Sequence, residues 1–427
     1  MQKIRGNIIT LALVASTSPL ALASQQDDAK GFIDGSSFNI LSRNVFFHRD
    51  FRDGGGNKPY DSNGDGKNDA YRNGYNEEWA QGFLGVFQSG FTQGTLGFGV
   101  DGIGKLGIRL DTGNGRSGSG LLDVDDSGHA DSSYSVLGGA AKVRLSNTVL
   151  RYGDQQVKLP IFNTSDSRLL PEVARGYLLT SQEIPDLTLN AGHFTSLNYK
   201  GDSSHDSARL TSINFAGGTY NFSTALLGSL YYAKTDDYFH KTYGKLLYIR
   251  PLSSSQSLKF DFNTYAIKSE GEARAGVMDN ISWSLGTSYA IGAHTFTVVH
   301  QRTSGTGNAY HGVDGGDTWV MGNAVQYSDF NYDDEHSWQA RYDIDLAPYG
   351  VPGLSFMTRY VRGDNITTAT SSGGTQWERD IEGRYVVQSG TAKNLSVRVR
   401  QATARSAVVG YQLDEVRVIV EYPLNVF

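Results

Sequence analysis

Short segments in which apolar and polar residues alternate recur along most of this chain. In residues 395–400 (LSVRVR) the three apolar side chains share one face, and Ser396, Arg398 and Arg400 share the other, because side chains alternate faces along a strand. The same alternation surrounds Arg384 and Arg417. Each of these segments predicts a strand with one apolar face and one cationic face.

Turn residues separate these segments, and long and short connections alternate. The first strand is expected at residues 32–48. Short turns are expected at residues 92–94, 146–147, 184–186, 217–218, 251–256, 291–293, 348–353 and 389–391. If residues 319–327 formed a spanning strand, the tight turn at 348–353 would fall among the long loops. Treating residues 304–335 as one long loop, folded into the barrel, restores the alternation. The count then predicts an all-β fold, an 18-stranded antiparallel transmembrane β-barrel with both termini on the periplasmic side.

Composition and targeting signals support an outer-membrane location. The chain has no cysteine, 51 glycines, 24 tyrosines and 20 phenylalanines, and no helix-length 3.6-residue period. After residue 23 no apolar run approaches the roughly 20 residues that a spanning helix needs. Composition alone leaves a periplasmic or secreted β-protein open. A Gram-negative outer-membrane barrel, open to water within, agrees better with the alternating strands.

The N-terminus has the pattern of a secretory signal peptide. Lys3 and Arg5 precede a short apolar run and an A-x-A site that ends at Ala23. We therefore expect residues 1–23 to be a signal peptide and residues 24–427 a single barrel domain. Removing the two cations changes the formal charge from -6 to -8, which argues against a nucleic-acid partner.

A barrel in lipid determines which way the arginines point. An arginine that faces the bilayer midplane costs about 2–4 kcal/mol, so the polar faces must line the pore. Strand parity places eight arginines on lumen faces, from strands that become neighbours when the barrel closes: Arg43, Arg109, Arg144, Arg151, Arg384, Arg398, Arg400 and Arg417. Guanidinium groups in series would pass anions without a deep trap. The alternative is that they pair with Asp111, Asp380 and Glu382 and only stiffen the wall.

The chain resembles the OprD-type outer-membrane carboxylate channels (Occ family) of pseudomonads. The resemblance rests on motifs that follow one another in the family's order over nearly the whole mature chain. They are residues 43–50 (RNVFFHRD), 78–83 (EWAQGF), 167–171 (SRLLP), 191–194 (AGHF), 326–330 (QYSDF), 337–343 (SWQARYD), 349–354 (YGVPGL), 385–390 (YVVQSG) and 417–424 (RVIVEYPL).

The resemblance implies a substrate-specific porin, not an enzyme, with a basic arginine ladder and a constriction made by external loops three and seven. Carried onto this chain, loop three is residues 159–175 and loop seven is residues 304–335. Their constriction residues would be Asp166, Ser167, Arg168, Asp317, Asn323, Ser328 and Asp329. For any one of the loop-seven acids, a turn-capping role is equally open.

The resemblance also implies passive uptake of small organic acids or amino acids by a protein embedded in outer-membrane lipid. The form of loop three and the short loop seven favour aromatic or cyclic carboxylates. A channel for basic amino acids or peptides, or an unselective general porin, remains the alternative. We expect a monomer or weak trimer.

One external loop has part of a calcium-binding pattern. Asp61, Asn63, Asp65 and Asp69 occupy positions 1, 3, 5 and 9 of a calcium loop, but Arg72 stands where the bidentate glutamate belongs. A structural calcium ion is one reading, and a polar loop without an ion is the other. We expect no other cofactor.

Overall fold

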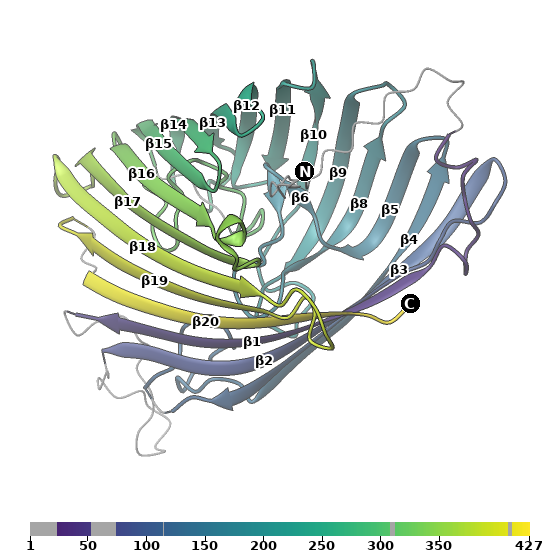
Figure 1. The fold of residues 1–427 in the computed structure, drawn as a ribbon, viewed down its shortest axis with the longest axis horizontal. Helices are drawn as coiled ribbons and strands as arrows, with labels where there is room; N and C mark the ends of the chain where they lie inside the picture. The colour runs from purple at the N-terminus through teal and green to yellow at the C-terminus, as the bar shows by residue number, and fades with distance from the viewer. Residues whose placement is uncertain (1–23, 53–73, 114, 308–311, 409–411) are drawn as a thin grey trace.

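Eighteen strands form one closed antiparallel sheet in the computed structural model, which describes residues 24–52, 74–113, 115–307, 312–408 and 412–427 (Figure 1). The barrel strands are β1 (Ser37–Phe51), β2 (Tyr75–Gln88), β3 (Leu96–Asp111), β4 (Ser133–Leu145), β5 (Thr148–Gln155), β8 (Val173–Ser181), β9 (Leu187–Asn198), β10 (Ile213–Asn221), β11 (Leu226–Thr235), β12 (Phe239–Ser253), β13 (Gln256–Ser269), β14 (Asp279–Ile291), β15 (His294–Thr306), β16 (His336–Asp345), β17 (Leu354–Ile366), β18 (Gly374–Val386), β19 (Ser396–Ser406) and β20 (Gln412–Asn425). The predicted fold class is confirmed.

The first and last strands close the barrel. β1 pairs with β2 on one side and with β20 on the other, and Arg43 lies opposite Glu421 across the closure. Two short strands, β6 (Lys158–Leu159) and β7 (Phe162–Asn163), form a hairpin within loop three. The 3-10 helix η1 (Ala347–Tyr349) lies in the turn between β16 and β17. Within the described residues, no helix is long and apolar enough to cross a membrane.

The two faces of the sheet differ as the alternation requires. Outward side chains are large and apolar: Leu137 is 82% exposed, Leu230 65% and Trp338 57%. Inward apolar side chains are buried where loops cover the wall, in one cluster around Phe162 and Tyr265 and another around Phe47. The apolar outer surface meets lipid, while the inner surface carries loops and polar groups.

Several predicted boundaries were wrong. Gly217 and Gly218 lie inside β10 rather than in a turn, and a Cβ at Gly217 would come within 2.4 Å of the Leu230 carbonyl oxygen. These glycines allow close approach within the sheet, which sequence alone does not separate from turn formation. β1 begins at Ser37 and continues to Phe51, whereas the prediction placed it at residues 32–48. Loops three and seven cover residues 156–172 and 307–335.

Loop seven is anchored to the inner wall by buried charged groups. Lys241 of β12 pairs with Asp314, and both side chains are at most 1% exposed. Glu378 of β18 accepts the backbone N–H groups of Tyr327 and Ser328, at 2.8 and 2.7 Å. A buried ion pair is costly to break from one side, so these contacts hold loop seven against the wall.

An arginine cluster at the candidate constriction

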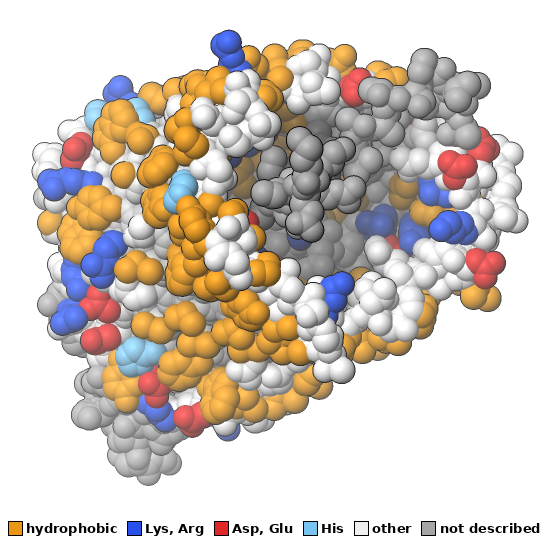
Figure 2. All heavy atoms as spheres, in the orientation of Figure 1, with side chains coloured by type: hydrophobic (Ala, Val, Ile, Leu, Met, Phe, Trp, Pro, Cys, Tyr) orange, Lys and Arg blue, Asp and Glu red, His pale blue; other side chains and the backbone are white. Residues whose placement is uncertain are grey.

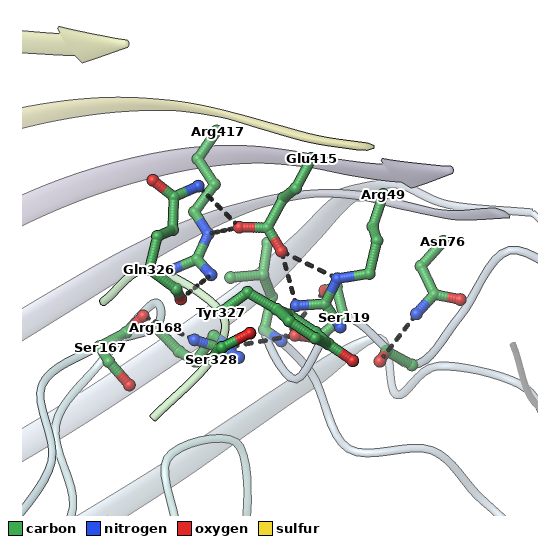
Figure 3. A network of polar contacts seen from close by, with 12 residues as sticks. Arg49, Asn76, Ser119, Ser167, Arg168, Gln326, Tyr327, Ser328, Glu415 and Arg417 are labelled. Carbon is green, nitrogen blue, oxygen red and sulfur yellow. Dashed lines mark hydrogen bonds and ion pairs between the residues drawn. The ribbon is translucent and has the colours of Figure 1, made fainter. Parts of the chain in front are cut away.

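Three guanidinium groups surround the Phe47 ring at the inner wall. The Cζ atoms of Arg49 and Arg417 each lie 5.0 Å from the ring centre, and that of Arg168 lies 5.7 Å away. Arg49 also lies 4.9 Å from the ring of Tyr327. Strands β1 and β20 contribute Arg49 and Arg417, whereas Arg168 comes from loop three (Figure 3). We call Arg49, Arg168 and Arg417 the arginine cluster.

Glu415 is the acid within this cluster. Its Oε2 accepts from Nε and Nη2 of Arg49, at 2.8 and 2.6 Å, and its Oε1 accepts from Nε of Arg417 at 2.5 Å (Figure 3). Gln326 of loop seven donates to the same Oε1 at 2.9 Å. Three arginines with one bound glutamate leave two net positive charges, and this net charge attracts an anion.

Loop three carries Arg168 into the cluster. Its Nε donates to the Ser119 carbonyl oxygen at 3.0 Å, and its Nη1 donates to the Ser167 carbonyl oxygen at 3.1 Å. Burial, together with the nearby charges of Arg417 and Arg49, lowers the pKa of Arg168 to about 9. Arg168 therefore stays mostly charged at neutral pH, in a place where it is repelled by its neighbours.

Arg43 fixes the tip of loop three. Its Nη1 and Nη2 donate to the two Asp166 carboxylate oxygens at 2.6 and 3.1 Å, and its Nε donates to Glu421 at 2.7 Å. The Leu169 carbonyl oxygen accepts from the same guanidinium at 3.1 Å. Arg43 is only 6% exposed, so the structure gives it an anchoring geometry.

The other predicted constriction residues divide into three groups. Asp166 and Ser167 are exposed at the tip of loop three. Asp317 accepts from the Ser165 hydroxyl at 2.8 Å and the Asp166 N–H at 3.2 Å, so it joins loop seven to loop three. Asn323 and Ser328, at 0% and 6% exposure, are buried anchors.

Asp329 of loop seven takes part in holding that loop through its backbone. Its carbonyl oxygen accepts from the Gln301 amide at 2.9 Å, and the side chain is half-buried.

Arginines also face one another across neighbouring strands of the lumen wall. The sheet register pairs Arg341 with Arg359, Arg384 with Arg398, and Arg400 with Arg417. Like charges directly opposite in a sheet are destabilising. Acids offset two of the pairs, through Arg341–Asp343, Arg359–Asp380, Arg400–Glu382 and Arg417–Glu415 ion pairs.

Arg384 and Arg398 differ from the other pairs. Within the described residues, neither guanidinium forms a hydrogen bond or ion pair. They lie beside the short turn between β18 and β19, so they face the half of the lumen beyond the arginine cluster, toward the periplasm. The inward arginines thus run from the arginine cluster through Arg400 to the Arg384 and Arg398 side chains near the periplasmic turn.

The remaining predicted arginines lie apart from this series, on β3 to β5. Arg109 donates to the Ala130 carbonyl oxygen, and Arg151 pairs with Asp101 at 2.9 Å. Arg144 donates to the side chain of Gln26 at 2.8 Å and stacks over Phe91 near the periplasmic turns. The eight predicted arginines share the inward face, and Arg109, Arg144 and Arg151 contact groups outside the arginine cluster.

Sequence reasoning missed four members of the site. Arg49 was lost because the predicted first strand ended at His48, one residue too early. Glu415 lies on the same face as Arg417, two residues away, and this spacing was the available signal. No sequence pattern indicated that Phe47 and Tyr327, from β1 and loop seven, would meet at Arg49.

The predicted calcium ligands Asp61, Asn63, Asp65 and Asp69 lie outside the described residues. Among the residues that the structure does describe, no group of three or more acids and histidines could hold a metal ion.

A closed eighteen-stranded barrel with an apolar exterior and a loop-narrowed, arginine-lined lumen defines an outer-membrane channel. The family model for outer membrane porins of the OprD family matches residues 30–426. The chain belongs to this family of substrate-specific porins, which are channels of the Gram-negative outer membrane and not enzymes.

Individual relatives support the same family assignment. Porin D of Pseudomonas aeruginosa is 40% identical over the whole of both chains. The porin-like protein GalP of Pseudomonas putida is 32% identical over 97% of each. Among solved structures, a BenF-like porin from Pseudomonas fluorescens is 35% identical over 93% of this chain and all of its own, with a TM-score of 0.85. Pseudomonas aeruginosa OpdK, solved with vanillate, is 33% identical over 92% of this chain and all of its own, with a TM-score of 0.83.

Proposed function

We propose that this channel passes small carboxylates, with aromatic or cyclic carboxylates preferred, along inward-facing arginines by passive diffusion. The observation that carries the proposal is the arginine cluster around Phe47. Several guanidinium groups in one place suit a carboxylate, and the half-buried Tyr327 ring, 4.9 Å from Arg49, suits the ring of an aromatic or cyclic ligand.

The charge arrangement supports a conducting role. Glu415 already occupies donors of Arg49 and Arg417. The cluster therefore attracts an incoming carboxylate but binds it less tightly than three unpaired arginines would. The Arg400, Arg398 and Arg384 side chains continue toward the periplasm, so an anion that leaves the cluster meets further cations. Weak sites in series favour passage over trapping.

Two relatives give the substrate class some support. The OpdK structure contains vanillate, an aromatic carboxylate, and the BenF-like porin is a second neighbour with nearly complete coverage. Uptake of basic amino acids is the alternative, and it would use the lumen acids as well as the arginines. Asp166 is the acid that such a cationic substrate would meet, because its side chain is 40% exposed beside Arg43.

Uptake into proteoliposomes tests the proposal. Benzoate, cyclohexanecarboxylate, arginine and the uncharged benzamide would be compared at equal concentration with the wild-type protein. We expect benzoate and cyclohexanecarboxylate to enter several-fold faster than benzamide. Arginine entering faster than benzoate would support the alternative, and equal rates for all four solutes would contradict both.

A substitution in the cluster links uptake to the site. Arg168→Gln keeps a donor for the Ser119 carbonyl oxygen but removes one of the three charges. Benzoate uptake should fall while benzamide uptake stays within about twofold. Lys259→Gln is the matched control, because Lys259 is a half-exposed lumen cation on β13, away from the cluster.

A further inference from the structure

The outer surface of the barrel carries unpaired arginines at one place. Arg302 of β15, Arg362 of β17 and Arg379 of β18 have outward parity, because their neighbours Gln301, Val361 and Glu378 are fully buried inside. All three arginine side chains are exposed. Within the described part of the chain, none of them forms a side-chain hydrogen bond or an ion pair. We call these three residues the outer arginine patch.

The patch lies at the edge of the lipid-facing surface nearest the long loops. Arg302 is three residues past Val299 and four before the end of β15, and Arg362 is four residues before the end of β17. In Figure 2, basic side chains lie among apolar ones at the left edge of the molecule, where Figure 1 places the long-loop ends of β17 to β19. The long loops face the exterior, so the lipid at this level is the outer leaflet.

Tryptophan side chains alternate with these arginines across the strands. The register places Arg362 between Trp338 of β16 and Trp377 of β18, and it places Arg302 beside Trp283 of β14. Tryptophan is typical of the headgroup level of a membrane, where an arginine can reach polar groups. The patch therefore lies where lipid headgroups contact the barrel.

Other outward cations near the long-loop end are already neutralised. Lys234 pairs with Glu270 at 2.9 Å, and Lys268 pairs with Asp279 at 3.3 Å. Arg405, next to the patch, pairs with Asp414 at 3.1 Å. Asp364, opposite His336, is the acid that the register places beside the patch. The surface of β15 to β18 thus has an excess of positive charge that the neighbouring strands lack.

We propose that the outer arginine patch binds the phosphate groups of a phosphorylated glycolipid of the outer leaflet, of the lipid A type. Guanidinium forks match phosphate geometry, and the apolar surface below the patch accommodates acyl chains. Tyr360, at 43% exposure, and Val298, at 52%, belong to that apolar surface. The glycolipid would cover the outer surface of β15 to β18 and leave the pore open.

Lipid retention by the full-length protein tests this. Wild type and the triple variant Arg302→Gln, Arg362→Gln, Arg379→Gln would be purified in detergent and incubated with bisphosphorylated lipid A or with lipid A stripped of phosphate. Bound lipid would be counted by native mass spectrometry. Each cation near an anionic lipid is worth about fivefold in affinity, so the triple variant should bind bisphosphorylated lipid A about a hundredfold more weakly.

A matched variant and a folding check complete the design. Lys234→Gln with Lys268→Gln removes outward cations that are already ion-paired, and it should change lipid A binding less than twofold. Unaltered single-channel conductance would show that the triple variant is folded. Equal binding of bisphosphorylated lipid A by wild type and triple variant overturns the proposal. The proposal is also overturned if the wild type binds phosphate-free lipid A as tightly as bisphosphorylated lipid A. Displacement of lipid A by an equal concentration of phosphatidylglycerol overturns it as well.

Discussion

Neutralising Arg384 and Arg398 together isolates the contribution of the inward arginines to anion preference. These two side chains face each other across β18 and β19, and neither forms a hydrogen bond or ion pair with a described residue, so the double variant Arg384→Gln, Arg398→Gln removes charge without leaving a buried acid unpaired. Removing a like-charged cross-strand pair should leave stability unchanged or raise it by about 0.2–1 kcal/mol.

The expected size of the effect follows from Coulomb's law. A carboxylate passing about 5 Å from one guanidinium in water gains about 0.8 kcal/mol, and two such groups give about 1.5 kcal/mol before salt screening. This corresponds to about a tenfold lower anion occupancy of that part of the lumen. We expect the chloride-to-potassium permeability ratio to fall several-fold and benzoate uptake to fall with it.

Planar-bilayer recordings in a potassium chloride gradient measure this ratio directly, through the reversal potential. The matched control is Arg302→Gln with Arg362→Gln, which removes two charges from the outside of the same barrel. That control should keep the wild-type reversal potential. If the lumen variant also keeps it, the inward arginines do not set selectivity and the reasoning is refuted.

Three other perturbations probe the cluster and loop seven. Glu415→Gln raises the net charge of the arginine cluster by one, so benzoate should block single-channel current for longer, by about fivefold or more, and shorter block events would contradict this. Burial raises the pKa of Glu335 in loop seven to about 7, above its unfolded value, so this residue should make the free energy of unfolding fall by up to about 3 kcal/mol as pH rises from about 4.5 through 7. Urea titrations at several pH values would show that slope, and Glu335→Gln should flatten it. Asp314→Asn leaves Lys241 buried without its partner and should cost about 3–5 kcal/mol with noisier current, whereas replacing both residues by apolar ones should cost less.

The strand count and the two faces could be predicted from sequence because both depend on local alternation. Residues 319–327 show how the number of strands was decided. They are apolar enough for a strand, but the alternation of long and short connections excluded them. In the structure they lie in loop seven against the inner wall. Strand ends depend on pairing with neighbours, which local pattern does not contain. The first strand was therefore shifted, and Arg49 was lost from the site.

The partners of each arginine could not be predicted, and they change what the arginines can do. Arg43 and Arg398 have the same residue type and the same inward parity, yet Arg43 is held by Asp166 and Glu421, while Arg398 forms no ion pair or hydrogen bond with a described residue. The difference comes from loop three, which bends inward and brings Asp166 to β1 from more than a hundred residues away. A row of arginines in a barrel sequence thus defines candidates for a conducting path, and the inward loops decide which of them remain free to meet an anion.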